Sequence, residues 1–325
     1  MTYMYKNLKR LVTLVLLPVF LVFSCQTTED PDLLDDDSLE LMSLEETLAS
    51  FDDGTEEASD ADRGKRKRPR FRTLSKALAI TGLVPVIVKN RVTIFAPTDN
   101  AFKKLGITPK NVREVENLKE ILLYHVVKGR VFSNDLVPGF VPTVNGAAVE
   151  VNLEGGVFIN QAEVIKADLR FRRGVIHIID EVLLPPTQNI VEIAVGNENF
   201  SILVEAVVKA GLDGVLSGDG PFTVFAPTND AFVELLGILG VDGLDDIPIE
   251  TLTAVLLYHV VDGRVYSSDL TTGPVSTLGG EFTVDVSTLT IDDTGSDVDA
   301  NLIPEGLNIQ GTNGVIHVID KVLLP

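Results

Sequence analysis

The chain has 325 residues, of which 45% are hydrophobic and 23% charged, so it can fill the cores of two domains of ordinary size. Its formal net charge of −20 argues against nucleic acid as a partner, because a polyanion is bound by basic surfaces. A single cysteine excludes an intrachain disulfide, so cysteine pairing gives no information on the redox compartment.

The first 24 residues have the pattern of a signal peptide. Lys6, Lys9 and Arg10 precede an apolar run over residues 11–23 that is short for a bilayer span. Residues 22–25 (VFSC) then resemble a bacterial lipoprotein cleavage box. We therefore predict that residues 1–24 are removed and that Cys25 carries a lipid, rather than being an ordinary thiol. The mature chain would be tethered to a membrane without spanning it.

Residues 25–70 are predicted to form a charged, mostly disordered tether, since few of their side chains could be buried in a core. From Glu29 to Asp62 every charge is acidic, and residues 63–72 are strongly basic. We interpret the basic run as a solvated segment, a contact with anionic lipid head groups, or a segment that folds back on the acidic part. Residues 33–48 could still form a short amphipathic helix that docks on the first domain, because Leu41, Leu44 and Leu48 share a face.

The remainder of the chain contains one long pattern twice. Three blocks recur in the same order: residues 93–102 (TIFAPTDNAF) and 223–232 (TVFAPTNDAF), 124–127 and 258–261 (YHVV), and 174–180 (GVIHIID) and 314–320 (GVIHVID). A repeat this long indicates two whole domains, which we place at residues 71–186 and 187–325. The offset between the blocks grows along the chain. We therefore expect insertions in surface loops of the second copy, near residues 240–243 and within residues 292–301.

Each block predicts a local structure. The first reads as a strand followed by a helix that Thr98 or Thr228 caps at its N-terminus. The second ends an amphipathic helix at the Tyr-His pair, where His125 and His259 are either bonded to backbone groups or part of a binding site. The third is a strand that is apolar on both faces, so His177 and His317 are expected in the core, satisfied by internal hydrogen bonds.

Catalytic and metal-binding patterns are weak. Each copy offers two histidines and no cysteine, which does not suit a transition-metal site, and no G-x-S-x-G nucleophile motif occurs. Asp297, Asp299 and Asn301 place three oxygen ligands at alternating positions, but the glycine and glutamate of a calcium-binding loop are missing. A solvated acidic loop is the preferred reading over a calcium site. We expect no enzymatic activity and no cofactor.

Together the three blocks resemble those of the fasciclin domain family, in both halves of the chain. The resemblance implies an α+β protein with two tandem fasciclin folds, each a β-sandwich-like wedge flanked by helices. It also implies extracellular adhesion, or binding to matrix, carbohydrate or other proteins. In some animal members the region around Tyr-His has been linked to receptor binding. Carried over by position, this makes Tyr124, His125, Tyr258 and His259 candidate partner-binding residues.

The first copy departs from the family pattern at its start. The opening helix of the family, visible as residues 189–194 in the second copy, has no clear counterpart directly before Phe71. Either residues 43–48 supply it from across the charged insert, or the first domain is truncated.

These observations predict a cell-envelope lipoprotein, lipid-anchored at the outer membrane, that binds extracellular protein or polysaccharide through its two fasciclin domains. Surface or periplasmic exposure is left open. Two modules on one anchor would raise avidity if both bind. The alternative is a non-catalytic accessory scaffold in an envelope or glycan-uptake complex.

Overall fold

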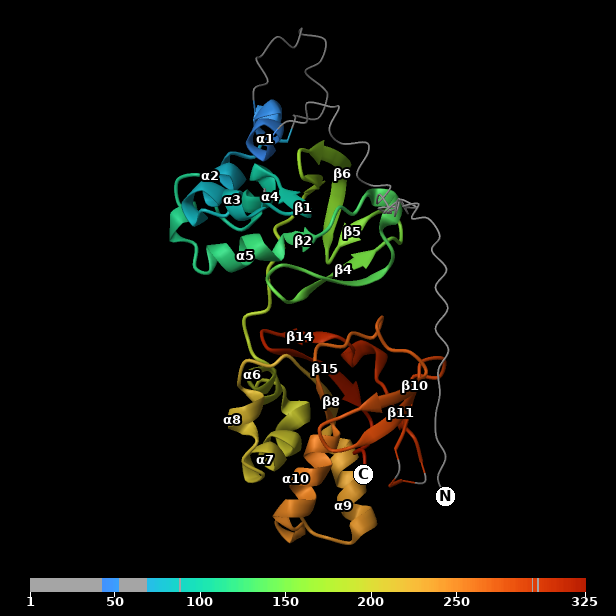
Figure 1. The fold of residues 1–325 in the computed structure, drawn as a ribbon. Helices are drawn as coiled ribbons and strands as arrows, with labels where there is room; N and C mark the ends of the chain where they lie inside the picture. The colour runs from blue at the N-terminus through green and yellow to red at the C-terminus, as the bar shows by residue number, and fades with distance from the viewer. Residues whose placement is uncertain (1–42, 53–68, 88, 294, 297) are drawn as a thin grey trace, which may run out of the picture. The chain divides into compact units, whose positions relative to one another are not determined.

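A computed structural model describes residues 43–52, 69–87, 89–293, 295–296 and 298–325 (Figure 1). The predicted signal peptide, the predicted lipid site at Cys25 and most of the predicted tether lie outside these residues. Within the described part of the chain, no helix combines the length and apolar character that a membrane crossing requires.

Domain 1 contains the first repeat copy. Its helices are α1 (Leu44–Asp52), α2 (Arg72–Thr81), α3 (Val84–Ile87), α4 (Asp99–Lys104) and α5 (Leu118–Tyr124). Its strands are β1 (Val92–Pro97), β2 (Val126–Lys128), β3 (Gly139–Pro142), β4 (Ala148–Asn152), β5 (Phe158–Ile159), β6 (Ala162–Phe171) and β7 (Gly174–Ile179). These strands form one sheet in the order β2-β1-β7-β6-β5-β4-β3.

Domain 2 contains the second copy. Its helices are α6 (Ile190–Val195), α7 (Ser201–Lys209), α8 (Asp213–Leu216), α9 (Asn229–Leu239) and α10 (Ile249–Tyr258). Its strands are β8 (Phe222–Pro227), β9 (Val260–Asp262), β10 (Gly273–Ser276), β11 (Glu281–Asp285), β12 (Thr290–Asp292), β13 (Ala300–Asn301), β14 (Ile309–Gly311) and β15 (Gly314–Ile319). They form two sheets, β14-β15-β8-β9 and β10-β11-β12-β13.

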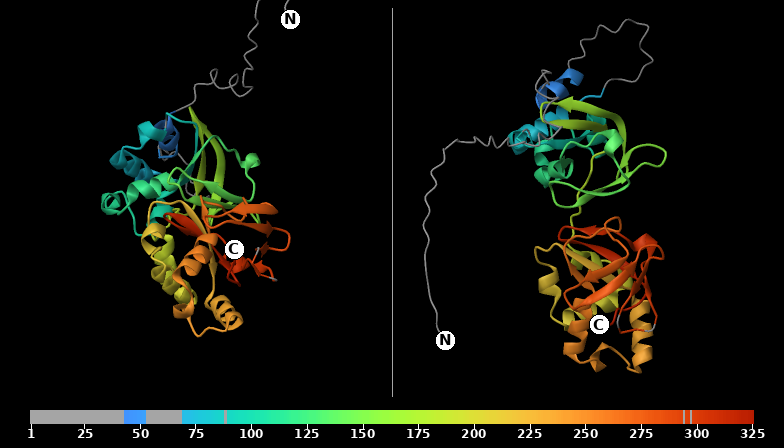
Figure 2. Two further views of the ribbon diagram at one scale, coloured as in Figure 1. Left: turned by 60° about the horizontal axis from the view of Figure 1, so that its bottom comes forward. Right: turned by 45° about the vertical axis from the view of Figure 1, so that its right-hand side comes forward.

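A parallel strand pair forms the centre of each domain. β1 pairs with β7 and β8 pairs with β15, in the same register: Phe95 lies opposite His177, and Phe225 opposite His317. All six residues of β7 and of β15 are buried. They are buried because the helices gather on one face of the pair, while the antiparallel strands close the other, as both views of Figure 2 show.

Each domain therefore has two apolar clusters, one on either face of its parallel pair. The helix-side cluster of domain 1 includes Phe71, Phe102 and Leu122, and the strand-side cluster includes Phe95 and Tyr124. Domain 2 repeats this division. The α+β class and the arrangement as two tandem domains that the sequence predicts are confirmed.

α1 supplies the opening helix of domain 1 from across the charged insert. Ser43 and Glu46 form a capping box in which Ser43 N–H donates to Glu46 Oε2 (2.7 Å) and Glu46 N–H donates to Ser43 Oγ (3.1 Å). Asn189 and Glu192 make the same two bonds at the start of α6. Leu44 and Leu48 are buried in the helix-side cluster. Domain 1 thus has an opening helix like that of domain 2, and the segment predicted as mostly disordered contains a packed helix over Leu44–Asp52.

The two insertions of the second copy take different forms. The first lengthens a helix: α9 has 11 residues, whereas its counterpart α4 has 6. Our placement of this insertion in a loop near residues 240–243 was wrong, because residues 233–239 continue the helix up to Gly240, which caps it at a φ of 66°. The described part of the second insertion lies between β12 and β13, as predicted.

Candidate functional site

The histidine of each Tyr-His pair ties the end of a helix to the last segment of its domain. His125 Nδ1 lies 2.7 Å from Ile121 O, and its Nε2 accepts a hydrogen bond from Leu183 N–H (2.9 Å). His259 repeats this with Val255 O (2.7 Å) and Leu323 N–H (2.9 Å). Since Nε2 accepts, Nδ1 carries the proton and donates to the carbonyl, which makes both rings neutral.

Burial keeps these two rings uncharged. Each is 2% exposed, and desolvation lowers the pKa of His125 and of His259 to about 4, despite the hydrogen bond that each makes to a backbone carbonyl. Neither histidine is therefore suited to proton transfer near neutral pH, and their arrangement serves the fold.

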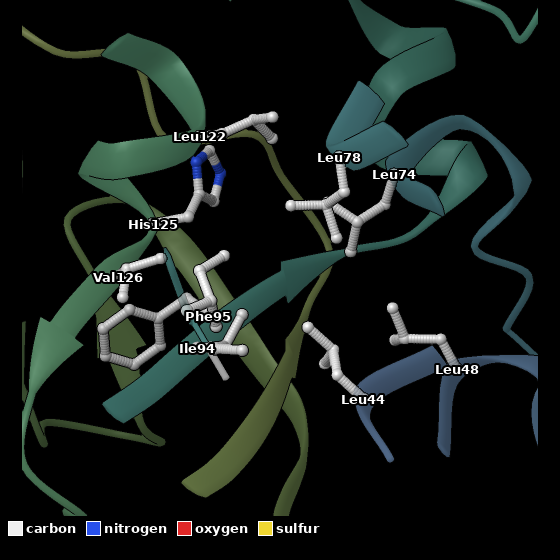
Figure 3. Close-up of a pocket in the computed structure, with 10 residues that line it drawn as sticks. Leu44, Leu48, Leu74, Leu78, Ile94, Phe95, Leu122, His125 and Val126 are labelled. Carbon is white, nitrogen blue, oxygen red and sulfur yellow. The ribbon is translucent and has the colours of Figure 1, made fainter. Parts of the chain in front are cut away.

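His125 also borders a small apolar cavity under α1 (Figure 3). Leu44 and Leu48 of α1 face Leu74 and Leu78 of α2 across it. The cavity encloses about 10 Å³, at the lower limit for one water molecule. Since both His125 nitrogens are already bonded, a water would find no polar partner, so this space is a packing defect and not a ligand site.

The tyrosine of each pair fixes the start of a strand. Tyr124 Oη donates to Ala148 O, and Tyr258 Oη donates to Glu281 O, both at 2.7 Å. The equivalent carbonyls of β4 and β11 are therefore held in the same way in the two domains.

The four candidate partner-binding residues are thus placed inside the domains. Tyr124, His125, Tyr258 and His259 are each at most 2% exposed. Their partner-binding role stays a prediction.

His177 and His317 lie in the core, as predicted. Their Nε2 atoms are 2.9 Å from Val131 O and Val265 O, and both rings are fully buried. Desolvation lowers the pKa of each.

The calcium candidate receives no support from the residues that can be described. Asp297 lies outside them, and Asp299 is exposed. Asn301 donates through its side-chain amide to Asp320 Oδ2, so it is engaged within the domain. Among the described residues, no cluster of three His, Cys, Asp or Glu is placed to hold a metal ion.

Domain 2 has a surface groove of about 370 Å³ beside α9. Ala231, Leu235 and Ile238 of α9 form one wall, and Val298 and Leu324 contribute to the other. Ile238 is 75% and Val298 60% exposed, which is unusual for such side chains when they gather in one place. The polar groups of the groove include Lys321 and Glu234, which pair at 2.7 Å.

A second surface lies where the two domains touch. The side-chain amide of Gln310 pairs with the backbone of Ala148: Ala148 N–H donates to Oε1, and Nε2 donates to Ala148 O, each at 3.0 Å. Ala148 N–H also donates to Tyr266 Oη (3.0 Å). The Tyr266 ring stacks on Phe140, with centroids 4.7 Å apart and an interplanar angle of 2°.

Sequence reasoning missed both surfaces. The groove depends on the lengthened α9, which the block pattern did not predict. The domain contact had one signal: Tyr266 and Gln310 occupy positions that are Phe132 and Arg170 in the first copy, inside otherwise matching segments. Different side-chain types at equivalent positions of the two repeats are what we expect in a sequence when only one repeat uses those positions for a contact.

Comparison with known proteins agrees with this architecture. The sequence profile described as Fasciclin domain matches twice, over residues 69–185 and 198–325. The chain belongs to the fasciclin family.

Its relatives include an animal and a bacterial protein. Transforming growth factor-beta-induced protein ig-h3 of Sus scrofa is 31% identical over 247 residues, which cover 72% of this chain and 34% of that protein. The chain thus spans about a third of this relative. Protein sll1483 of Synechocystis is 39% identical over 148 residues, covering 46% of this chain and 79% of that protein.

Among solved structures, a FAS1 domain pair from the insect cell adhesion molecule fasciclin I is 22% identical, with a TM-score of 0.35. It covers 78% of this chain and 97% of that chain.

Proposed function

We propose that this protein is a lipid-anchored envelope protein that binds an extracellular protein and so mediates adhesion, without catalysis. Family membership supports an adhesive role. The buried, neutral histidines argue against histidine as a general acid or base, because such a group has to reach its substrate.

The groove beside α9 is the observation that carries the proposal. Its volume is in the range of ligand sites, and its walls are mostly aliphatic. Among the described residues that line it there is no aromatic side chain, which favours an apolar protein segment over a polysaccharide as the ligand. Ile238 and Val298 would anchor that segment, and the Lys321–Glu234 pair would lie at its edge.

Binding of intact cells to immobilised extracellular proteins and glycans tests this function. The full-length chain and its Ile238→Glu variant are compared, with Val208→Glu as the matched control, because Val208 is also exposed (59%) but lies on α7. We expect a loss of about tenfold or more for Ile238→Glu, since a charge would enter the apolar contact, and little change for the control. Equal binding by both variants would exclude the groove. No binding by native cells to any protein would overturn the adhesive function.

Protease treatment of intact cells tests the location, with a Cys25→Ala form as control. Digestion of the native protein, lost or redistributed in the Cys25→Ala form, agrees with a lipid-anchored protein at the cell surface. Protection until the outer membrane is opened would favour the alternative, a non-catalytic scaffold in an envelope or glycan-uptake complex.

A further inference from the structure

The contact between the domains joins two unlike faces. Domain 2 contributes what we call a head face, formed by Tyr266, Ser268 and Gln310. Domain 1 contributes a tail face, formed by Phe140 and Ala148. In addition to the amide pairing and the aromatic stack, Phe140 N–H donates to Ser268 Oγ (3.3 Å). Because the two faces differ, the contact is heterologous and, within the part of the chain that the structure describes, leaves one face of each kind unused.

The internal repeat identifies the unused head face on domain 1 as Phe132, Asn134 and Arg170. It has the same local support as its counterpart: Phe132 N–H donates to Asp135 Oδ2 as Tyr266 N–H does to Asp269 Oδ2. Arg170 lies over the Phe132 ring, 4.8 Å from its centroid. The second face is therefore preformed.

The unused tail face lies on domain 2 and consists of Pro274 and Glu281. Glu281 matches Ala148, because its carbonyl accepts the Tyr258 hydroxyl as that of Ala148 accepts Tyr124. Pro274 matches Phe140, since they pair with corresponding residues of β11 and β4. Both Pro274 and Glu281 are exposed.

These two unused faces are complementary. Docking Phe132 on Pro274 would replace the aromatic stack, and Arg170 would meet Glu281 where Gln310 meets Ala148 in the existing contact. The opposite net charges of the two domains would also favour this contact. Residues 69–185 contain 16 Lys and Arg against 11 Asp and Glu, a net charge of +5, whereas residues 187–325 contain 3 against 21, a net charge of −18.

We propose that copies of this chain associate head to tail, with the Phe132–Arg170 face of one copy docked on the Pro274–Glu281 face of another. A heterologous contact of this kind builds rings or open filaments. The partner is a second copy of the same chain, so the proposal stands apart from the extracellular ligand proposed above and holds or fails separately from it.

Sedimentation of the full-length mature chain in mild detergent tests the association. We expect the average mass to rise with protein concentration at low salt, and to fall as salt is added, since the contact depends on opposite charges. Arg170→Glu and Glu281→Arg would each weaken self-association about tenfold or more, because each places like charges in the contact. The controls Arg113→Glu and Glu250→Arg change the net charge equally at exposed positions outside both faces and would leave it unchanged.

Mixing the two disrupted variants gives the decisive result. In a solution of one variant, residues 170 and 281 of neighbouring copies carry the same charge. In the mixture, every contact between unlike variants joins opposite charges, so association is expected to return. We expect both variants to fold, since both positions are exposed, and circular dichroism checks this. A monomeric native protein at high concentration would overturn the proposal. So would association that the controls reduce as much as the face variants do, or a mixture that stays dissociated.

Discussion

At the scale of single residues, the buried histidines make stability depend on pH. Each of His125 and His259 has a pKa of about 4 in the folded protein, against 6.5 for an unperturbed histidine. The unfolded state therefore binds more protons between these values, and the free energy of unfolding falls as the pH falls from 6.5 to 4. We expect a loss of up to about 3 kcal/mol per histidine over this range.

Urea unfolding at neutral pH and near pH 4.5 measures this loss, with His259→Gln as the comparison. Glutamine keeps polar atoms near Leu323 N–H but does not titrate. The variant will be less stable at neutral pH, because one buried hydrogen bond is lost or distorted, yet its stability will change less with pH. If the native chain and the variant lost equal stability on acidification, His259 would not be the titrating group.

At the scale of elements, α1 is expected to be required for the stability of domain 1. Leu48→Ala would remove buried methyl groups opposite Leu74 and Leu78, at a cost of about 2–5 kcal/mol. Ser43→Ala would break the capping box and cost about 0.5–2 kcal/mol. Thermal unfolding and hydrogen exchange of domain 1 measure both effects. Ala49→Ser, at an exposed position of the same helix, is the control. Unchanged exchange in α2 and α5 for Leu48→Ala would show that α1 does not seal the core.

The elements also show what the sequence could and could not predict. Thr98 and Thr228 were predictable helix caps because the motif is local, and both accept the expected bond, from Ala101 N–H and Ala231 N–H. α1 was predicted only in part. Its leucine spacing indicated a helix, but its acidic surroundings resembled a disordered tether until packing on α2 was known. The length of α9 was missed because Gly240 stops a helix at a point that the block pattern does not mark.

For the candidate site too, the features set by local sequence were predictable, and those set by distant contacts were not. The burial of His177 and His317 was predictable from an apolar strand, whereas the full burial of the Tyr-His pairs was underestimated. Their partners, Leu183 and Leu323, lie about sixty residues away in sequence, and only the fold brings them together. The contact between the domains likewise joins residues that are far apart in the sequence: Ala148 and Gln310 are separated by 162 residues.

At the scale of the whole molecule, we expect the hydrogen bonds and the aromatic stack between the domains to restrict their relative movement. Gln310→Ala would remove both hydrogen bonds to Ala148 and the Tyr266 hydroxyl's acceptor, at an expected cost of about 1–3 kcal/mol to domain docking. Tyr266→Phe would keep the stack on Phe140 and lose only the hydroxyl bonds, so its effect would be smaller.

Small-angle scattering and residual dipolar couplings of the native chain and the two variants measure this movement. We expect Gln310→Ala to broaden the distribution of domain orientations, while the unfolding of each domain stays unchanged, because the contact lies outside both main cores. Gly139 provides a further test. A Cβ there would lie 3.1 Å from Ser268 Cβ at a φ of 133°, so Gly139→Ala would crowd Ser268 and also strain the start of β3. Domains that tumble independently in the native chain would contradict the contact, and would also remove the template from which the head and tail faces were inferred.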